Sequence, residues 1–294
     1  MANQNRQLRG RMRAVGNTRK ITRTMELVAT SKLKRAQDRV AAARPYAQAL
    51  KEVLADLITP ELMAAFPLLR RPLPPSKGGP KTAAVILITS NRGLAGGFNS
   101  NLIKEGRKRI EELEAAGYQV DLHSVGKRGA GFFKYLGRKL GADRQDIGER
   151  PTVAHAVSVV EPLIKEYEAG RLASVDLVYA HFNSALSTPP KTVRILPVEA
   201  PVAGSKSRPD YILEPNAEAI LAGLLPLYVR NMVYRGLVET AAGFYGAQRT
   251  AMKSATDNAG EILEYLKRTY NRGRQAQITQ EIAEIVGGSA ALQG

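Results

Sequence analysis

Residues 251–273 read AMKSATDNAGEILEYLKRTYNRG, and mostly small or apolar side chains recur in them at alternating steps of four and three. The full series is Val238, Ala242, Tyr245, Arg249, Met252, Thr256, Ala259, Leu263, Leu266, Tyr270 and Gly273. Its mean step of 3.5 residues is the period of a coiled coil. The pattern predicts one long helix over residues 216–288, capped by Asn216 and bent by Pro226, that packs along a second helix.

A matching series lies at the other end of the chain, within a helix predicted over residues 3–58. Its positions are Thr22, Met25, Ala29, Leu33, Ala36, Val40, Ala43, Ala47, Leu50, Leu54 and Leu57, again with a mean step of 3.5. Pro45 is expected to kink this helix without ending it, because the series resumes in register. Both series are rich in alanine and threonine, which let helices approach closely. The two ends of the chain therefore pair most simply as an antiparallel coiled coil.

The C-terminal helix is the longer one, so its end is predicted to project beyond the pair. At 1.5 Å per residue the two helices would measure roughly 84 and 108 Å. The projecting residues 278–292 have no charged side chain after Glu284, although chain ends are usually polar. Two interpretations stay open: a partner encloses this end, or it folds back on its own domain.

Between the two helices the sequence predicts a domain of alternating strands and helices. Apolar runs predict strands at 83–89, 119–125, 175–182 and 192–197, and amphipathic runs predict helices at 99–116, 127–140 and 152–169. Proline-rich and glycine-rich connectors at 59–81 and 197–209 flank this region. The predicted fold is therefore α/β, with a long antiparallel coiled coil and a small open, mostly parallel sheet. The domain boundaries follow as 1–58, 82–198 and 210–294.

Charge and composition limit the possible partners. The 294 residues have a formal net charge of +16, and residues 1–58 hold 13 Lys/Arg against 4 Asp/Glu. Such a surplus attracts nucleic acid, acidic membrane surfaces or acidic proteins without choosing among them. The absence of cysteine excludes disulfides and thiolate metal sites. The longest apolar run, residues 83–88, is far shorter than the roughly 20 residues of a membrane helix.

No motif predicts a catalytic, metal or cofactor site. Residues 90–99 follow a strand and precede a helix, but they lack the spacing of a phosphate-binding loop, so a tight turn is favoured. His123, His155 and His181 are isolated in the sequence, and for His123 and His181, which lie on predicted strands, a hydrogen-bonded structural role is favoured. Two alternatives keep a small weight: a helical nucleic-acid-binding protein, from the charge, and a Rossmann-like enzyme, from the turn at Gly93.

Three blocks of sequence resemble the gamma subunit of the rotary F-type ATP synthase. The blocks are Gly16 to Leu33 with Arg44-Pro45-Tyr46, the segment Asn91 to Asn99, and the C-terminal runs 251–259, 270–276 and 278–291. The resemblance implies a central-stalk rotor subunit that transmits torque between the membrane rotor ring and the catalytic hexamer. It implies no chemistry of its own and no cofactor.

The resemblance also implies partners and a location. The coiled coil would sit inside a hexamer of three alpha and three beta subunits, and the α/β domain would rest on the c-subunit ring with the epsilon subunit. Nucleic acid is not an expected partner. The compact connectors favour a bacterial protein, at the cytoplasmic face of the inner membrane and peripheral to it.

Particular residues inherit roles from this resemblance. Contact with a beta subunit is expected from Met25, Arg274, Gln275, Thr279, Gln280 and Glu281. Contact with the rotor ring is expected from Tyr211 and Glu214, and the apical bearing surface from Ile285, Val286, Ala290, Ala291 and Leu292. The sequence departs from the family at 242–245 (Ala-Gly-Phe-Tyr), at Lys267-Arg268 and at Gly273. Glycine at 273 is expected to cost roughly 0.5–1 kcal/mol of helix stability.

Overall fold

The chain forms two compact units, which are described separately. A computed structural model describes residues 2–74, 78–199 and 216–292. Unit 1 comprises residues 1–29 and 248–294, and unit 2 comprises residues 30–247. The helices α1 (Ala2–Leu57) and α6 (Ala217–Leu292) contribute to both units and continue through Pro45 and Pro226, respectively. The two long helices predicted from the 3.5-residue period are therefore confirmed.

Unit 1 is an antiparallel pair of helices. Asn5 donates a hydrogen bond to Gln277 (2.9 Å), and the Thr22 and Thr256 hydroxyls are hydrogen-bonded at 2.8 Å. Because the residue number rises along α1 while it falls along α6, the two helices run in opposite directions. The predicted series lines the interface, as the burial of Ala29 and Ala259 shows. Arg249 is the exception: its side chain is exposed, because burying an unpaired guanidinium would be costly.

Unit 2 is built on a five-stranded sheet. Its strands are β1 (Thr82–Ile88), β2 (Gln119–Val125), β3 (Ala142–Arg144), β4 (Leu172–Ala180) and β5 (Pro190–Leu196), in the order β3-β2-β1-β4-β5. The first four strands are parallel and β5 is antiparallel to β4. In the centre, Val85 of β1 pairs with Leu122 and with Asp176 on its two neighbours. The predicted mostly parallel sheet is confirmed.

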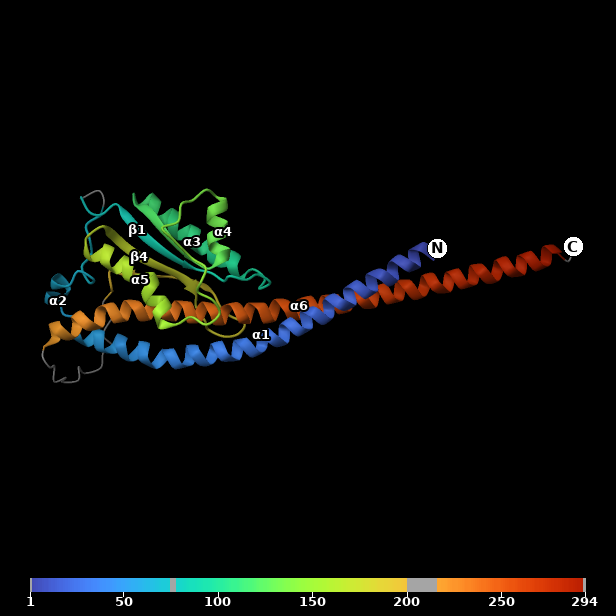
Figure 1. Cartoon of the computed structure of the whole chain (residues 1–294), viewed down its shortest axis with the longest axis horizontal. Coiled ribbons are helices and arrows are strands. Elements are labelled where there is room, and N and C mark those ends of the chain that lie inside the picture. Colours follow the sequence, from blue (N-terminus) through green and yellow to red (C-terminus); the bar gives the residue numbers. More distant parts are fainter. Residues whose placement is uncertain (1, 75–77, 200–215, 293–294) are drawn as a thin grey trace. The chain divides into compact units, whose positions relative to one another are not determined.

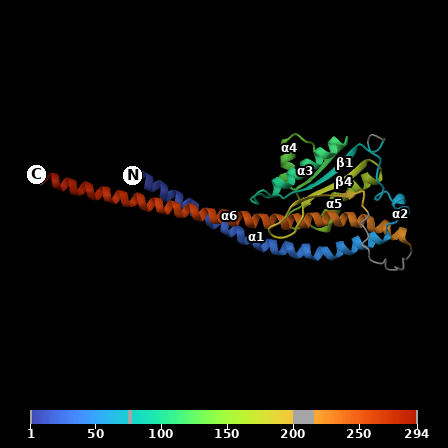
Figure 2. The same ribbon diagram turned by 180° about the vertical axis from the view of Figure 1, so that it is seen from behind.

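Helices cover both faces of this sheet (Figures 1 and 2). On one face, α3 (Phe98–Ala115) and α4 (Lys127–Tyr135) pack through Ile110 and Phe133 onto β1 and β2. On the other, α5 (Val153–Glu168) packs together with the unit 2 parts of α1 and α6. Buried residues of this second layer include Leu54, Val160 and Leu225. The helix pair is thus part of the core of unit 2.

Two short elements differ from the prediction. The connector predicted at 59–81 contains the helix α2 (Pro60–Ala65), which Thr59 caps by accepting a hydrogen bond from the Leu62 amide. The helix predicted at 127–140 ends at Tyr135, because Gly137 adopts a positive φ of 73° and turns the chain. The three-residue strand β3 follows and was not predicted, since three residues are too few to show a period.

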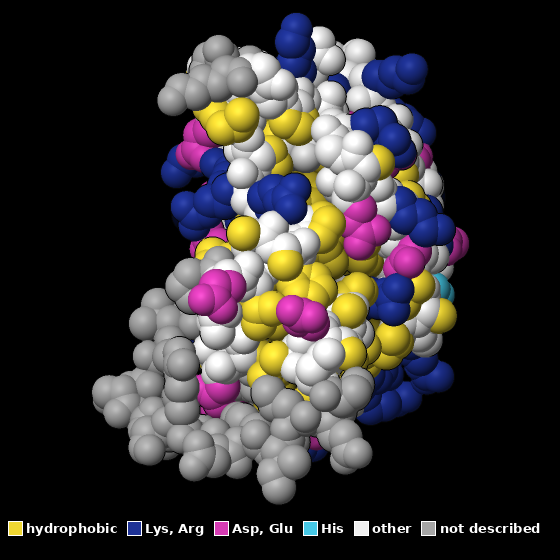
Figure 3. Space-filling view, turned by 90° about the vertical axis from the view of Figure 1, so that its left-hand side faces the viewer, with side chains coloured by type: hydrophobic (Ala, Val, Ile, Leu, Met, Phe, Trp, Pro, Cys, Tyr) yellow, Lys and Arg dark blue, Asp and Glu magenta, His cyan; other side chains and the backbone are white. Residues whose placement is uncertain are grey.

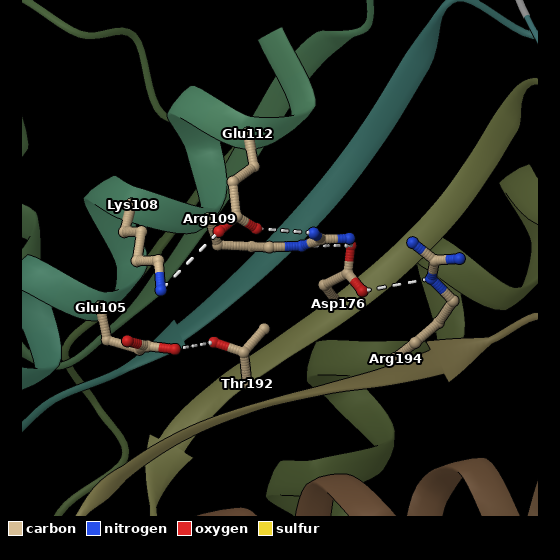
Figure 4. Close-up of polar contacts among 7 residues, drawn as sticks. All are labelled: Glu105, Lys108, Arg109, Glu112, Asp176, Thr192 and Arg194. Atoms are coloured by element: carbon tan, nitrogen blue, oxygen red, sulfur yellow. Dashed lines mark hydrogen bonds and ion pairs between the residues drawn. The ribbon is translucent and has the colours of Figure 1, made fainter. Parts of the chain in front are cut away.

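A buried carboxylate fastens the edge strand to the sheet (Figure 4). Asp176 lies on β4 with 1% of its surface exposed. Arg109 of α3 approaches its Oδ2 at 3.1 Å, and Arg194 of β5 approaches its Oδ1 at 3.4 Å. Beside this cluster, Thr192 donates to Glu105 at 2.7 Å. Because one carboxylate neutralises two cations from two elements, the cluster ties both α3 and β5 to the central strands.

Candidate functional site

The end of α6 presents an apolar stripe to solvent. Residues 278–289 are helical and every one is exposed. Ile278, Ile282, Ile285 and Val286 have exposed fractions of 47, 57, 72 and 60%. Their spacing of i, i+4, i+7 and i+8 places them on one helix face. This end does not fold back on its own unit, so that interpretation of its composition is wrong, and a continuous exposed apolar face indicates a protein interface.

Two of these isoleucines were missing from the predicted contacts. The resemblance supplied Ile285 and Val286 but not Ile278 and Ile282, although their spacing is readable in the sequence. The predicted residues Ala290, Ala291 and Leu292 continue the helix to its end at Leu292. The stripe therefore begins about two turns earlier than predicted.

Polar side chains beside the stripe are held by the helix itself. Gln277 donates to Glu281 at 3.0 Å, and Gln280 donates to Glu284 at 2.9 Å. The Thr279 hydroxyl donates to the carbonyl oxygen of residue 275 at 3.0 Å. All are exposed i, i+4 contacts, which a partner can replace at little cost. The predicted contact residues Thr279, Gln280 and Glu281 are therefore accessible to a partner.

Arg274 and Gln275 lie at the base of the stripe. Both side chains are exposed. Arg274 is one turn before Ile278 on the same helix face, and its guanidinium has no hydrogen-bond or ion-pair partner among the described residues. A free guanidinium beside an amide offers several directional donors to a carboxylate. The structure therefore groups Arg274, Gln275 and the apolar stripe on one short stretch of helix.

Gly273 has a packing role at the same level. A Cβ atom there would lie 2.9 Å from the Oδ1 atom of Asn5. The missing side chain lets Asn5 approach α6 and donate to Gln277. Glycine at this position thus permits a contact between the helices of unit 1, which offsets part of its cost in helix stability.

Met25 lies in a second exposed apolar region, on α1. Its side chain is half-buried at the helix interface, whereas Ile21 and Val28 on the same face are 61% and 50% exposed. The spacing of i, i+4 and i+7 makes these three residues one stripe. The resemblance indicated Met25, and the exposure adds the two β-branched neighbours.

Polar contacts connect α6 with the α/β part of unit 2. The Glu239 carboxylate is 1% exposed, accepts a hydrogen bond from the Phe182 amide (3.0 Å), and lies 2.7 Å from His181 Nδ1. Arg230 pairs with Glu161 of α5 at 2.8 Å. Unit 2 joins its sheet to its helix pair through such side-chain contacts as well as through the connectors.

Other predicted features have structural roles. Asn91 in the turn after β1 donates to the carbonyl oxygens of Gln145 and Ile147 (2.9 and 3.1 Å), which fits the predicted tight turn. His123 pairs with Asp121 at 2.9 Å, so the predicted hydrogen-bonded role is confirmed for it, as it is for His181 at Glu239. His155 has a structural role as well, because it completes the capping box of α5.

Some functional features fall outside what the structure describes. Tyr211 and Glu214, the predicted rotor-ring contacts, lie outside the described residues. Within residues 2–74, 78–199 and 216–292, no helix is both long and apolar enough to cross a bilayer. In the same ranges, His, Asp and Glu side chains form no group of three that could hold a metal ion.

Comparisons with known proteins agree with this architecture. Residues 4–292 match the family described as ATP synthase. An ATP synthase gamma chain from Gemmatimonas aurantiaca is 60% identical over 291 residues, which cover 98% of this chain and 99% of that protein. One from Frankia casuarinae is 42% identical, with 99% of each chain covered. A chain in the Euglena gracilis mitochondrial ATP synthase structure (OSCP/F1/c-ring) has a TM-score of 0.72 at 20% identity, covering 99% of this chain and 95% of that chain, which shows a shared fold.

Proposed function

The chain belongs to the family of ATP synthase gamma chains, and on this premise we propose that it is the central-stalk rotor subunit of an ATP synthase. It transmits torque between the membrane rotor ring and the catalytic hexamer of three alpha and three beta subunits. Proton translocation is thereby coupled to ATP synthesis or hydrolysis. The observation that carries the proposal is the exposed apolar stripe of α6 from Ile278 to Val286.

The stripe suits a shaft end enclosed by other subunits. Its side chains are apolar and its neighbouring polar groups are neutral or singly charged, so it can turn against an apolar sleeve without breaking strong ion pairs. Arg274, Gln275, Thr279, Gln280 and Glu281 supply directional contacts to a beta subunit, with Met25 contributing from α1. Val286 and Ile285 then form the bearing surface together with residues 290–292.

Unit 2 faces the rotor ring in this proposal. Tyr211 and Glu214 make this contact, with the c-subunit ring and the epsilon subunit as neighbours. One face of unit 2 exposes hydrophobic side chains between scattered charges (Figure 3). Such a mixed surface is typical of a protein interface.

The subunit itself is non-catalytic in this proposal, and it requires no cofactor. In this proposal the complex lies at the cytoplasmic face of the bacterial inner membrane, with this chain peripheral to the bilayer, and the bacterial origin of the similar gamma chains supports it. The surplus of basic residues in 1–58 is then a surface turned toward acidic protein neighbours. The two weaker alternatives, a nucleic-acid-binding protein and a Rossmann-like enzyme, explain neither the apolar stripe nor the family membership.

Reconstitution tests the proposal directly. Purified chain is mixed with alpha and beta subunits from the same source, and Mg-ATPase activity and complex composition are measured. We expect a complex that contains this chain and hydrolyses ATP. A variant with Ile278→Ser and Ile282→Ser should assemble less well, whereas Lys267→Ser, an exposed substitution outside the stripe, serves as the matched control. Hexamer that forms equally well without incorporating the chain would refute the proposal.

A further inference from the structure

Unit 2 contains a cavity at the carboxyl end of β1. Its volume is about 180 Å³, and its apolar lining includes Ile88, Val125, Ile147, Leu237 and Phe244. β1 pairs with β2 on one side and with β4 on the other, so the strand order reverses here. In open α/β sheets, ligands bind outside the carboxyl ends of the strands at such a switch point. The torque-transmitting role assigned to this chain makes no use of this cavity.

The lining includes part of the stretch that departs from the family pattern. Phe244 and Tyr245 belong to the lining, and Gly243 leaves room for Phe98 to pack edge-to-face on Phe244 at 6.1 Å. A Cβ atom on Gly243 would come within 3.0 Å of the Phe98 ring. This chain therefore has an aromatic wall at the cavity.

Two buried polar atoms at the cavity have no hydrogen-bond partner in the part of the chain that the structure describes. They are the hydroxyl of Tyr245, a residue that is 3% exposed, and the Oε1 atom of Glu149. The Arg92 Nη1 atom is 3.1 Å from that oxygen, as an ion pair, while Lys32 holds the other carboxylate oxygen at 2.6 Å. The Tyr245 hydroxyl is near Glu149, but no hydrogen bond of normal geometry joins them. One buried group of each residue therefore remains available to a ligand.

The protonation states decide which ligand fits. Burial, aided by the Glu149 carboxylate, raises the pKa of Tyr245, so its hydroxyl stays protonated and can donate. Burial alone would raise the pKa of Glu149, but the hydrogen bond from Lys32, the nearby Tyr245 hydroxyl and the charges of Lys32 and Arg92 lower it, so Glu149 is an ionised acceptor. An anion would have to compete with this carboxylate for Arg92 and Lys32, which already pair with it. A neutral hydroxyl group can accept from Tyr245 and donate to Glu149, and therefore satisfies both.

We propose that this cavity binds a small neutral hydroxylated aromatic molecule of the phenol class. Its ring would lie among Leu237, Ile147 and Phe244, and its hydroxyl would lie between Tyr245 and Glu149. The size agrees, because apolar cavities of about 150 Å³ accommodate a benzene ring. The proposal is independent of the torque-transmitting function, since it concerns a site on the isolated chain.

Calorimetry and NMR on the complete chain with phenol as the probe test the proposal. We expect saturable binding in the millimolar range, as ligands of so few atoms bind, with intermolecular NOEs from phenol to Leu237 and Phe244. Tyr245→Phe should weaken binding roughly 2- to 10-fold through loss of one hydrogen bond. Ala241→Leu, which fills the cavity, should abolish it, and Tyr265→Phe, an exposed tyrosine in unit 1, should leave it unchanged.

Three results would overturn the proposal. One is the absence of saturable binding by the unmodified chain, which would leave water as the occupant. Another is equal binding by Ala241→Leu. The third is tighter binding of benzoate than of phenol, because it would contradict the argument from the Glu149 charge. The NOEs need no substitution, so a variant that fails to fold does not prevent a decision.

Discussion

Changing Glu239 to alanine is expected to lower the free energy of unfolding by about 2–4 kcal/mol, because it removes the buried acceptor of the Phe182 amide and the partner of His181. Its carboxylate is 1% exposed and interacts with the Phe182 amide, with His181 and with Arg235. The alanine variant leaves the Phe182 amide buried without an acceptor, which alone costs about 1–3 kcal/mol. Arg235 is 34% exposed and can turn to water, so its share of the loss is smaller.

Urea unfolding of the complete chain, followed by circular dichroism and tyrosine fluorescence, measures this loss. Glu239→Gln keeps the size and one acceptor but not the charge, so it should cost less, about 1–2 kcal/mol. Glu111→Ala removes an exposed i, i+4 pair with Arg107 from α3 of the same unit and should cost at most about 0.5 kcal/mol. If Glu239→Ala costs no more than Glu111→Ala, the buried network does not hold α6 to the sheet and the reasoning fails.

Three further outcomes follow from the structure. Replacing Arg274 and Gln275 together with alanine should reduce ATP-driven proton pumping in the assembled complex and leave the melting temperature of the isolated chain nearly unchanged; unaltered pumping would contradict their role. The hydrogen bond from Arg144 lowers the pKa of Asp146 to about 2; because this is below its unfolded value, the contribution is present above about pH 4 and is lost as pH falls through about 2, and a carboxyl NMR titration with a midpoint near 4 would disprove it. Gly126→Ala should destabilise by about 2–3 kcal/mol in urea unfolding, because φ is +100° and the new Cβ would lie 2.2 Å from a carbonyl oxygen of residue 89; Gly131→Ala, with open space around it, is the control, and equal stabilities would count against the strain.

The periodic parts of the fold could be predicted because their physics is local. A 3.5-residue step specified α1 and α6, and apolar runs specified the buried strands such as β1 and β4. The helix α2 and the strand β3 are too short to show a period, so their formation depends on caps and neighbours. Arg249 lies at a position of the 3.5-residue series, but its charged side chain is not suited to a buried interface. Its exposure shows that periodicity alone does not decide which residues are buried.

The candidate site likewise has features that the sequence predicts and features that only the three-dimensional structure shows. The apolar residues from Ile278 to Val286 lie on consecutive turns of one helix, so the sequence alone shows their helical spacing. Only part of the stripe was predicted. The networks around Asp176 and Glu239 join side chains that are far apart in the sequence. No regular spacing of residues therefore predicts these networks. The cavity at the end of β1 depends on how Phe244 and Phe98 pack, which likewise requires the three-dimensional structure.

The Asn5–Gln277 hydrogen bond marks a change in mechanical stiffness along α6. Before it, α6 is packed against α1, and twisting either helix must shear a packed seam. After it, residues 278–289 form a single exposed helix, which resists twisting less. A torque applied near Arg274 therefore acts on the stiff helix pair. A torque applied at Val286 first twists the single helix. In a rotary motor this segment would act as a short torsional spring that smooths uneven steps.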